Sequence, residues 1–97
     1  MRDLFIIRTR IEIERRRRIM VSIWAYAYEF KNRSLVSDAV FDAECSKVNS
    51  NIKTGRLDEF FTNVFQPHTG MWIHKHPELN GVEMLYRRIG YEYMDYR

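Results

Sequence analysis

Large apolar side chains recur at helical spacing in the first third of the chain, and this pattern constrains the fold more than any other feature. Between about residue 15 and residue 32, apolar residues fall on one face of a helical wheel while polar residues occupy the rest. The apolar face consists of Met20, Ile23, Trp24, Ala27 and Phe30. The spacing predicts an amphipathic helix that must pack this face against another part of the chain.

The preceding segment supports two interpretations. "IIRTRIEIE" (residues 6–14) partly alternates apolar and polar residues, as a half-exposed strand does. Yet Ile6, Ile13 and Met20 keep a constant spacing of seven residues, which suits a helix. We favour one long helix from about residue 4 to residue 32, and a strand in the first part of this range stays the alternative.

A second helix is expected after the short polar connection "KNRSL". Ser37 suits its N-cap, because a hydroxyl accepts a hydrogen bond from a free amide of the first turn. Asp38 then lies in the first turn, where the helix dipole favours a negative charge. "NIKTGR" ends the helix, with Gly55 as a left-handed cap residue. The packed face consists of Phe41, Cys45, Val48 and Ile52.

Two short helices complete the prediction. An i, i+3, i+4, i+7, i+8 pattern predicts the first of them. Its apolar residues are Leu57, Phe60, Phe61, Val64 and Phe65. The other lies within residues 78–90, while "MWIHKH" before it and the tail "GYEYMDYR" after it are expected to be extended. We therefore predict one mainly α domain over residues 1–97, built on an antiparallel helix hairpin with these two further short helices.

Positive charge is concentrated near the N-terminus, since residues 1–34 hold nine of the 16 Lys and Arg residues. This distribution favours an anionic partner, which can be a phosphate, a nucleic acid or an acidic protein. Four consecutive arginines are expected to form a solvated turn of the first helix, with a nucleic-acid footprint as the sharper alternative. This arginine turn consists of Arg15, Arg16, Arg17 and Arg18.

Cysteine usage and hydropathy indicate the compartment. Cys45 is the only cysteine, so no disulfide can form within the chain, and a reducing, cytoplasmic location is expected. No apolar run is long enough to span a membrane. The arginine turn followed by "IMVSIWAYAY" imitates a signal peptide, but the preceding Glu12 and Glu14 and the aromatic residues argue against secretion.

Residues suited to catalysis are sparse. The chain has no glycine-rich phosphate loop, and Cys45 falls on an expected buried face, where a thiol acts as a small hydrophobe. His68, His74 and His76 lie close in sequence, but a zinc site needs further ligands that no other Cys or His cluster supplies. We therefore expect no catalytic residue, no metal and no required cofactor.

One group of residues points to a ligand. Asp38 and Asp42 border the buried face marked by Phe41, and Tyr28 borders the face of the first helix. If the two helices form an antiparallel hairpin through residues 31–36, these edges meet in a notch with an aromatic wall and two carboxylates. Aromatic faces stack flat heterocycles, and carboxylates accept hydrogen bonds from ribose hydroxyls. In the structural alternative, Phe41 is a core residue, Asp38 only balances the helix dipole, and the other two lie on the surface.

The stretch "YEFKNRSLVSDAVFD" resembles the small N-terminal helical subdomain, called Ia, of NAD-dependent DNA ligases. In that family a helix ends in a Tyr-His pair, and after a short loop a second helix opens with "SDAEYD" or a close variant. The family's Tyr, His, Asp, Tyr and Asp grip the nicotinamide mononucleotide (NMN) half of NAD. Tyr28, Asp38 and Asp42 match this set, while Glu29 replaces the histidine and Phe41 replaces the second tyrosine.

The resemblance implies a stand-alone, non-catalytic Ia-like module, extending loosely over about residues 11–52, that binds NAD or NMN. A basic side chain such as Arg33 would then neutralise the phosphate. Glu29 adds a negative charge where the family has an imidazole, and Phe41 keeps a stacking surface without the hydroxyl. The chain lacks the Lys-x-Asp-Gly adenylation motif of the ligases, so it is not itself a ligase.

A small basic accessory or inhibitor protein, of the kind that phages often encode, is the alternative function. It would use the Ia-like fold only as a scaffold and dock on a host protein or a nucleoprotein complex. Arginine and aromatic residues anchor interfaces, so its contact surface would be the arginine turn together with aromatic residues of the C-terminal part. These are Trp72, Tyr91, Tyr93 and Tyr96. Direct DNA or RNA binding ranks third, because no reader motif appears, and the oligomeric state stays open.

Overall fold

The computed structural model describes the backbone of residues 2–95 and the side chains of residues 9–88. In chain order the elements are α1 (Arg2–Lys31), α2 (Asp38–Lys47), α3 (Asp58–Asn63), the 3₁₀ helix η1 (Met71–Lys75) and α4 (Leu79–Asp95). No strand occurs among residues 2–95. The chain is a small, mainly α domain, as predicted, and the long first helix is confirmed in place of a strand.

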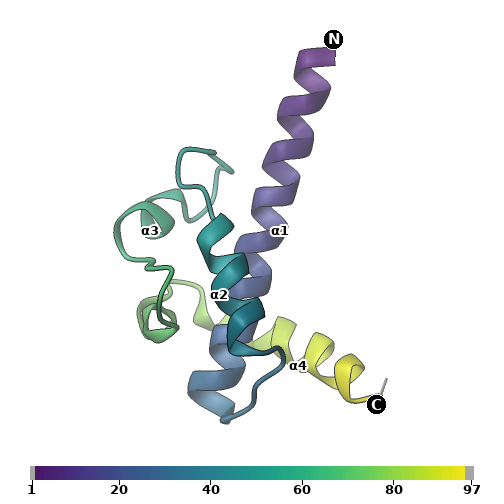
Figure 1. Ribbon diagram of the computed structural model, residues 1–97, viewed down its shortest axis with the longest axis vertical. Helices are drawn as coiled ribbons and strands as arrows, with labels where there is room; N and C mark the ends of the chain where they lie inside the picture. The colour runs from purple at the N-terminus through teal and green to yellow at the C-terminus, as the bar shows by residue number, and fades with distance from the viewer. Residues whose placement is uncertain (1, 96–97) are drawn as a thin grey trace.

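Helix α1 is the central element of the fold. Its C-terminal half packs against α2, η1 and α4, whereas its N-terminal half extends beyond the other helices (Figure 1). Helix α2 lies beside the C-terminal half of α1 after a connection over residues 32–37; the finer expectation of an antiparallel hairpin stays a prediction. Within the described part of the chain, no helix is both long and apolar enough to cross a membrane.

The C-terminal half of α1 is buried on several sides instead of along one stripe. Ile23 and Ala27 of the predicted face are buried, but Phe30 is 40% exposed. Neighbours outside that face are buried as well: Val21, Ala25 and Tyr26. A helix that is apolar on most sides must be covered on most sides, and here α4 covers one side while α2 and η1 cover others.

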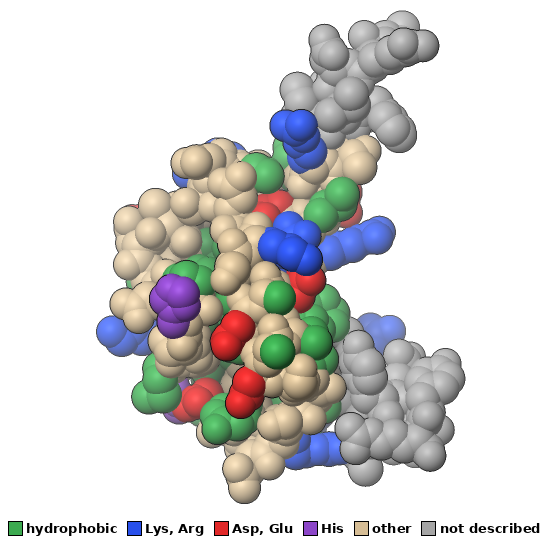
Figure 2. Space-filling view, in the orientation of Figure 1, with side chains coloured by type: hydrophobic (Ala, Val, Ile, Leu, Met, Phe, Trp, Pro, Cys, Tyr) green, Lys and Arg blue, Asp and Glu red, His purple; other side chains and the backbone are tan. Residues whose placement is uncertain are grey.

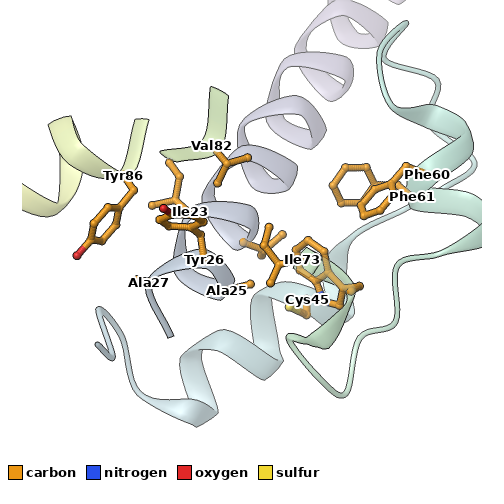
Figure 3. Packing of buried hydrophobic residues seen from close by; sticks show 12 residues of the cluster. Ile23, Ala25, Tyr26, Ala27, Cys45, Phe60, Phe61, Ile73, Val82 and Tyr86 are labelled. Atoms are coloured by element: carbon orange, nitrogen blue, oxygen red, sulfur yellow. The ribbon is translucent and has the colours of Figure 1, made fainter. Parts of the chain in front are cut away.

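The hydrophobic core lies around this half of α1. Figure 3 shows Tyr86 of α4 on one side of Ile23, with Ile73 and the α3 phenylalanines on the other; Val82 of α4 belongs to the same cluster. Trp72 belongs to this core: only 4% of it is exposed, and its ring lies 4.9 Å from the ring of Phe65. The expectation that Trp72 is part of a docking surface is therefore wrong, because η1 turns the indole inward onto the rings of α3.

Arg18 is buried, which corrects the expectation of a wholly solvated arginine turn. Only 4% of Arg18 is exposed, and its Nε donates to the buried Glu14 at 2.8 Å. Its Nη1 donates to Asp58 at 2.8 Å and to the Thr54 hydroxyl at 3.2 Å, and the guanidinium lies 5.1 Å from the ring centre of Phe61. Successive residues of a helix point about 100° apart, so four arginines in a row cannot all face solvent on a covered helix.

The same side chain explains why α2 ends earlier than expected. Nη2 of Arg18 donates to the backbone carbonyls of Asn49 at 3.0 Å and of Ile52 at 2.9 Å. The carboxylate of Glu14 accepts a hydrogen bond from the Asn49 amide at 3.0 Å. These bonds hold residues 48–54 as a loop around Arg18, so Ile52 lies in a turn and α2 stops at Lys47.

Two other local expectations are corrected at the C-terminal end. "MWIHKH" forms η1 instead of an extended segment, because the Ile73 amide donates to the Gly70 carbonyl and the His76 amide to the Ile73 carbonyl, each at 3.1 Å. The described part of the tail is also not extended, since α4 continues to Asp95. Tyr96 lies outside the described residues.

Candidate functional site

A surface cavity of about 380 Å³ lies between the C-terminal half of α1, the first turns of α2 and the residues just before η1. We call it the α1–α2 cavity. It contains all four residues that the sequence predicts for a nucleotide site, Tyr28, Asp38, Phe41 and Asp42. The other lining residues are Trp24, Ala25, Glu29, Ser34, Leu35, Val36, His68, Thr69, Gly70 and Met71.

The connection between α1 and α2 sets the position of the cavity. Asn32 adopts a left-handed conformation (φ 53°), which asparagine tolerates better than most residues, and ends α1. The Arg33 amide then donates to the Ala27 carbonyl at 2.9 Å, six residues back in the chain. The connection over residues 32–37 is short, and the start of α2 lines the same cavity as Tyr28 in the last turns of α1.

Ser37 caps α2, as predicted, and thereby orients its first turn. The Ser37 hydroxyl accepts a hydrogen bond from the Val40 amide at 3.2 Å, and its carbonyl accepts one from the Phe41 amide at 3.0 Å. Residues three and four positions apart lie on the same face of a helix. Asp38 therefore shares a face with Phe41 and Asp42, and all three line the cavity.

The walls of the cavity are aromatic and its polar groups are acidic. Tyr28 is 57% exposed, whereas Trp24 and Phe41 are half-buried, and the indole N–H of Trp24 has no acceptor among the described residues. Asp38 and Asp42 are exposed and form no ion pair within the described part of the chain. Figure 2 shows acidic side chains over α2 beside hydrophobic ones on this face.

Glu29 is paired with a histidine that the sequence does not place at the site. Nε2 of His74 lies 2.9 Å from Oε1 of Glu29, and the His74 ring lies 4.7 Å from the ring of Phe30. The contact spans 45 residues, because η1 packs against α1. An imidazole is therefore present beside the position where the resemblance shows Glu29 in place of a histidine.

No lysine or arginine lines the α1–α2 cavity within the described part of the chain. Arg33, the expected phosphate partner, donates from Nη1 to the hydroxyl of Tyr86 at 3.2 Å, on the α4 side. The ammonium group of Lys31 lies over the ring of Tyr26, 6.0 Å from its centre. The charge of the cavity is thus set by the carboxylates.

Cys45 is not a nucleophile at neutral pH. It is 1% exposed, and burial raises the pKa of its thiol to about 12, with the nearby carboxylates of Asp42 and Glu44 acting in the same direction. The thiol therefore stays protonated, and Cys45 is a small apolar core residue, as the sequence predicts.

The three histidines have separate surroundings. His68 lines the α1–α2 cavity, while His74 pairs with Glu29. His76 is buried, and its Nδ1 accepts a hydrogen bond from the Glu78 amide at 3.0 Å just before α4. Among the described residues, no group of three His, Cys, Asp or Glu side chains is arranged to hold a metal ion.

The expected docking surface is reduced to part of the arginine turn. Arg16 is exposed, and Arg15 pairs with Glu12. Arg17 pairs with Glu44 at 3.2 Å and so joins α1 to α2. Arg18 and Trp72 are buried, as described above. The side chains of Tyr91 and Tyr93 lie outside the described residues, as does the whole of Tyr96.

A second cavity, of about 260 Å³, lies between α1, the start of α3 and α4. Its walls are mostly apolar, with Ile19, Phe61 and Val82 among them. Three arginines line this cavity, and each already has a carboxylate partner. Arg15 pairs with Glu12, Arg18 with Glu14 and Asp58, and Arg56 with Glu78. This second cavity therefore offers a ligand little beyond apolar contact.

Comparison of the chain with protein-family models, with curated proteins and with solved structures finds no match. The likeness of residues 28–42 to the ligase Ia subdomain therefore rests on that segment alone. What the α1–α2 cavity binds has to be argued from its shape and its chemistry.

Proposed function

We propose that this chain is a non-catalytic binding module that recognises NAD or NMN in the α1–α2 cavity. One observation carries the proposal: Tyr28, Asp38, Phe41 and Asp42 line one cavity of about 380 Å³. From the sequence alone, these residues are expected to meet only if the first two helices form a hairpin through residues 31–36. Their convergence supports a ligand that needs both an aromatic wall and carboxylate acceptors.

The chemistry of the cavity suits the nicotinamide–ribose half of the ligand. A flat nicotinamide ring stacks on the faces of Tyr28, Phe41 or Trp24, and the ribose hydroxyls donate to the two aspartates. Ligand pockets usually have volumes of about 300 to 1,000 Å³. A cavity at the low end of this range holds one nucleoside and leaves the adenylate half of NAD outside.

The pair of Glu29 and His74 supports the same proposal. The resemblance raised the problem that Glu29 adds a negative charge beside two aspartates. His74 lies 2.9 Å from that carboxylate and offsets its charge when protonated, or satisfies it by a hydrogen bond when neutral. The imidazole that the ligase pattern has in sequence is thus supplied from η1.

In this proposal the module binds its ligand and catalyses no reaction. The one thiol of the chain is buried and protonated at neutral pH. A single free cysteine also suits a reducing compartment, so the proposal places the module in the cytoplasm. Sensing, sequestering or presenting the nucleotide are the roles open to such a module.

Calorimetric titration of the purified chain with NAD and with NMN tests this function. We expect micromolar binding, and a loss of about tenfold or more in affinity for Tyr28→Ala and for Asp42→Ala, because each removes a ligand contact. Glu59→Ala is the matched control, since it removes an exposed carboxylate outside the cavity. Unchanged affinity in both cavity variants, with circular dichroism showing intact folding, would show that the site is wrongly assigned.

The projecting half of α1 favours the accessory or inhibitor function as a second candidate. This half extends beyond the other helices (Figure 1), and Ile13, Arg16 and Ile19 are exposed on or near it. Charge reversal at Arg15 and Arg16 is expected to abolish capture of a host protein and to leave nucleotide binding unchanged. The loss of capture is measured by comparing the host proteins that the wild type and this double variant retain.

A further inference from the structure

The ionisable groups that line the α1–α2 cavity are unbalanced in sign. Three carboxylates line it, from Glu29, Asp38 and Asp42, and no lysine or arginine among the described residues does. Arg33 donates to Tyr86 on the α4 side, so it does not compensate them. The ring of His74 is hydrogen-bonded to Glu29. The two aspartates are left as uncompensated negative charges at the mouth of an aromatic cavity.

The aromatic rings and the carboxylates of the cavity both favour a positively charged ligand. The face of an aromatic ring carries a negative partial charge and attracts a cation placed over it. Carboxylates attract the same cation and repel a phosphate. A phosphate bound here would need an arginine or lysine, and the lining provides none.

We propose that the α1–α2 cavity selects a cationic pyridinium nucleoside of the nicotinamide riboside class over its 5′-phosphorylated forms. This inference rests on the proposed function and narrows its ligand. The positively charged ring stacks between the aromatic walls, and the vicinal ribose hydroxyls donate to Asp38 and Asp42. The unphosphorylated 5′ hydroxyl faces solvent, so no negative charge approaches the carboxylates.

Titration calorimetry at pH 8 with nicotinamide riboside, NMN, NAD and neutral nicotinamide tests the selection. We expect the riboside to bind at least about tenfold more tightly than NMN or nicotinamide, and to weaken as salt is raised. Tetramethylammonium serves as a probe for attraction of a cation without hydrogen bonds, and it is expected to bind more weakly because it has no hydroxyls.

Charge-neutral variants test whether the preference for the riboside over NMN comes from electrostatic attraction or from the shape of the cavity. The double variant Asp38→Asn, Asp42→Asn keeps the size of both side chains, and we expect it to lose riboside affinity and to bring the riboside and NMN close to equal. Glu59→Gln is the control outside the cavity, and it should leave both affinities unchanged.

The outcomes distinguish this inference from the function on which it rests. NMN or NAD binding as tightly as the riboside overturns the selection but leaves the nucleotide module standing. Tetramethylammonium binding as tightly as the riboside overturns the nucleoside assignment in favour of a general cation cavity. No binding of any of these ligands overturns the selection and the proposed function together.

Discussion

At the scale of single residues, Arg18 shows how a charged side chain can be part of a protein core. Its guanidinium makes five hydrogen bonds, to two carboxylates, one hydroxyl and two backbone carbonyls. Burying a charge is costly unless it is paired and its donors are satisfied, and here both conditions are met. The bonds join α1 to the 48–54 loop and to α3, so one residue fixes three segments.

Replacing Arg18 by Met is expected to lower the free energy of unfolding by about 3 to 5 kcal/mol, because the change removes the nearest ion-pair partner of the buried Glu14. Urea unfolding followed by circular dichroism measures the effect. Arg16→Met is the matched control at a neighbouring exposed position, with an expected change within about 0.5 kcal/mol. Similar small changes in both variants would contradict the role assigned to Arg18.

Asp58 makes the stability of this region sensitive to acid. The Thr54 amide, followed by the Arg18 guanidinium and the Gly55 amide, holds the pKa of Asp58 well below its usual range. An unfolded aspartate has a pKa of about 3.9, so below about pH 4 the unfolded chain binds a proton that the folded chain does not. The stabilisation is complete above that pH and is lost as the pH falls further.

We expect Asp58→Asn to be less stable than the wild type at pH 7 and to lose less stability between about pH 4 and pH 2. Thermal unfolding at a series of pH values measures both effects, with Glu59→Gln as a neighbouring exposed control. Parallel pH profiles for the wild type and Asp58→Asn would argue against Asp58 as a source of the acid sensitivity.

At the scale of elements, the sequence predicts the helix boundaries that depend on local spacing. It does not predict features that depend on a contact with a residue far along the chain. The length of α1 and the Ser37 cap follow from periodicity and capping chemistry, and both are confirmed. The end of α2 does not follow from periodicity, because Arg18 holds the carbonyls of Asn49 and Ile52 in a loop. The burial of Trp72 is likewise not predictable from local sequence, because it depends on the packing of η1 against the rings of α3.

Two glycines are expected to respond to alanine in opposite directions. Gly55 has a left-handed φ of 91° and open space around its Cα, so Gly55→Ala costs about 1 kcal/mol or more through backbone strain alone. Gly81 lies in α4, also in open space, so Gly81→Ala is expected to stabilise the protein by about 0.5 to 1 kcal/mol. Urea unfolding of the two variants, side by side, measures the difference. Changes of the same sign would contradict the conformations described.

At the scale of the whole molecule, the α1–α2 cavity is formed partly by residues close together in the sequence and partly by residues that the tertiary structure brings in from far along the chain. Tyr28, Asp38 and Asp42 were predictable because a short connection brings them together within one stretch of sequence. His68 and the Glu29 partner His74 were not, because they reach the site only when the chain returns through residues 68–75 to pack on α1. The absence of a cation from the described lining follows equally from tertiary structure, since Arg33 turns toward Tyr86.

The most direct test of the central claim, that the α1–α2 cavity binds a nicotinamide nucleoside, is a ¹H–¹⁵N chemical-shift titration of the labelled protein with nicotinamide riboside and with NMN. We expect dose-dependent shifts for either or both ligands, confined to the lining residues within 24–42 and 68–71. No shifts with millimolar ligand, or shifts centred on Leu57 and Val82 at the second cavity, would contradict it.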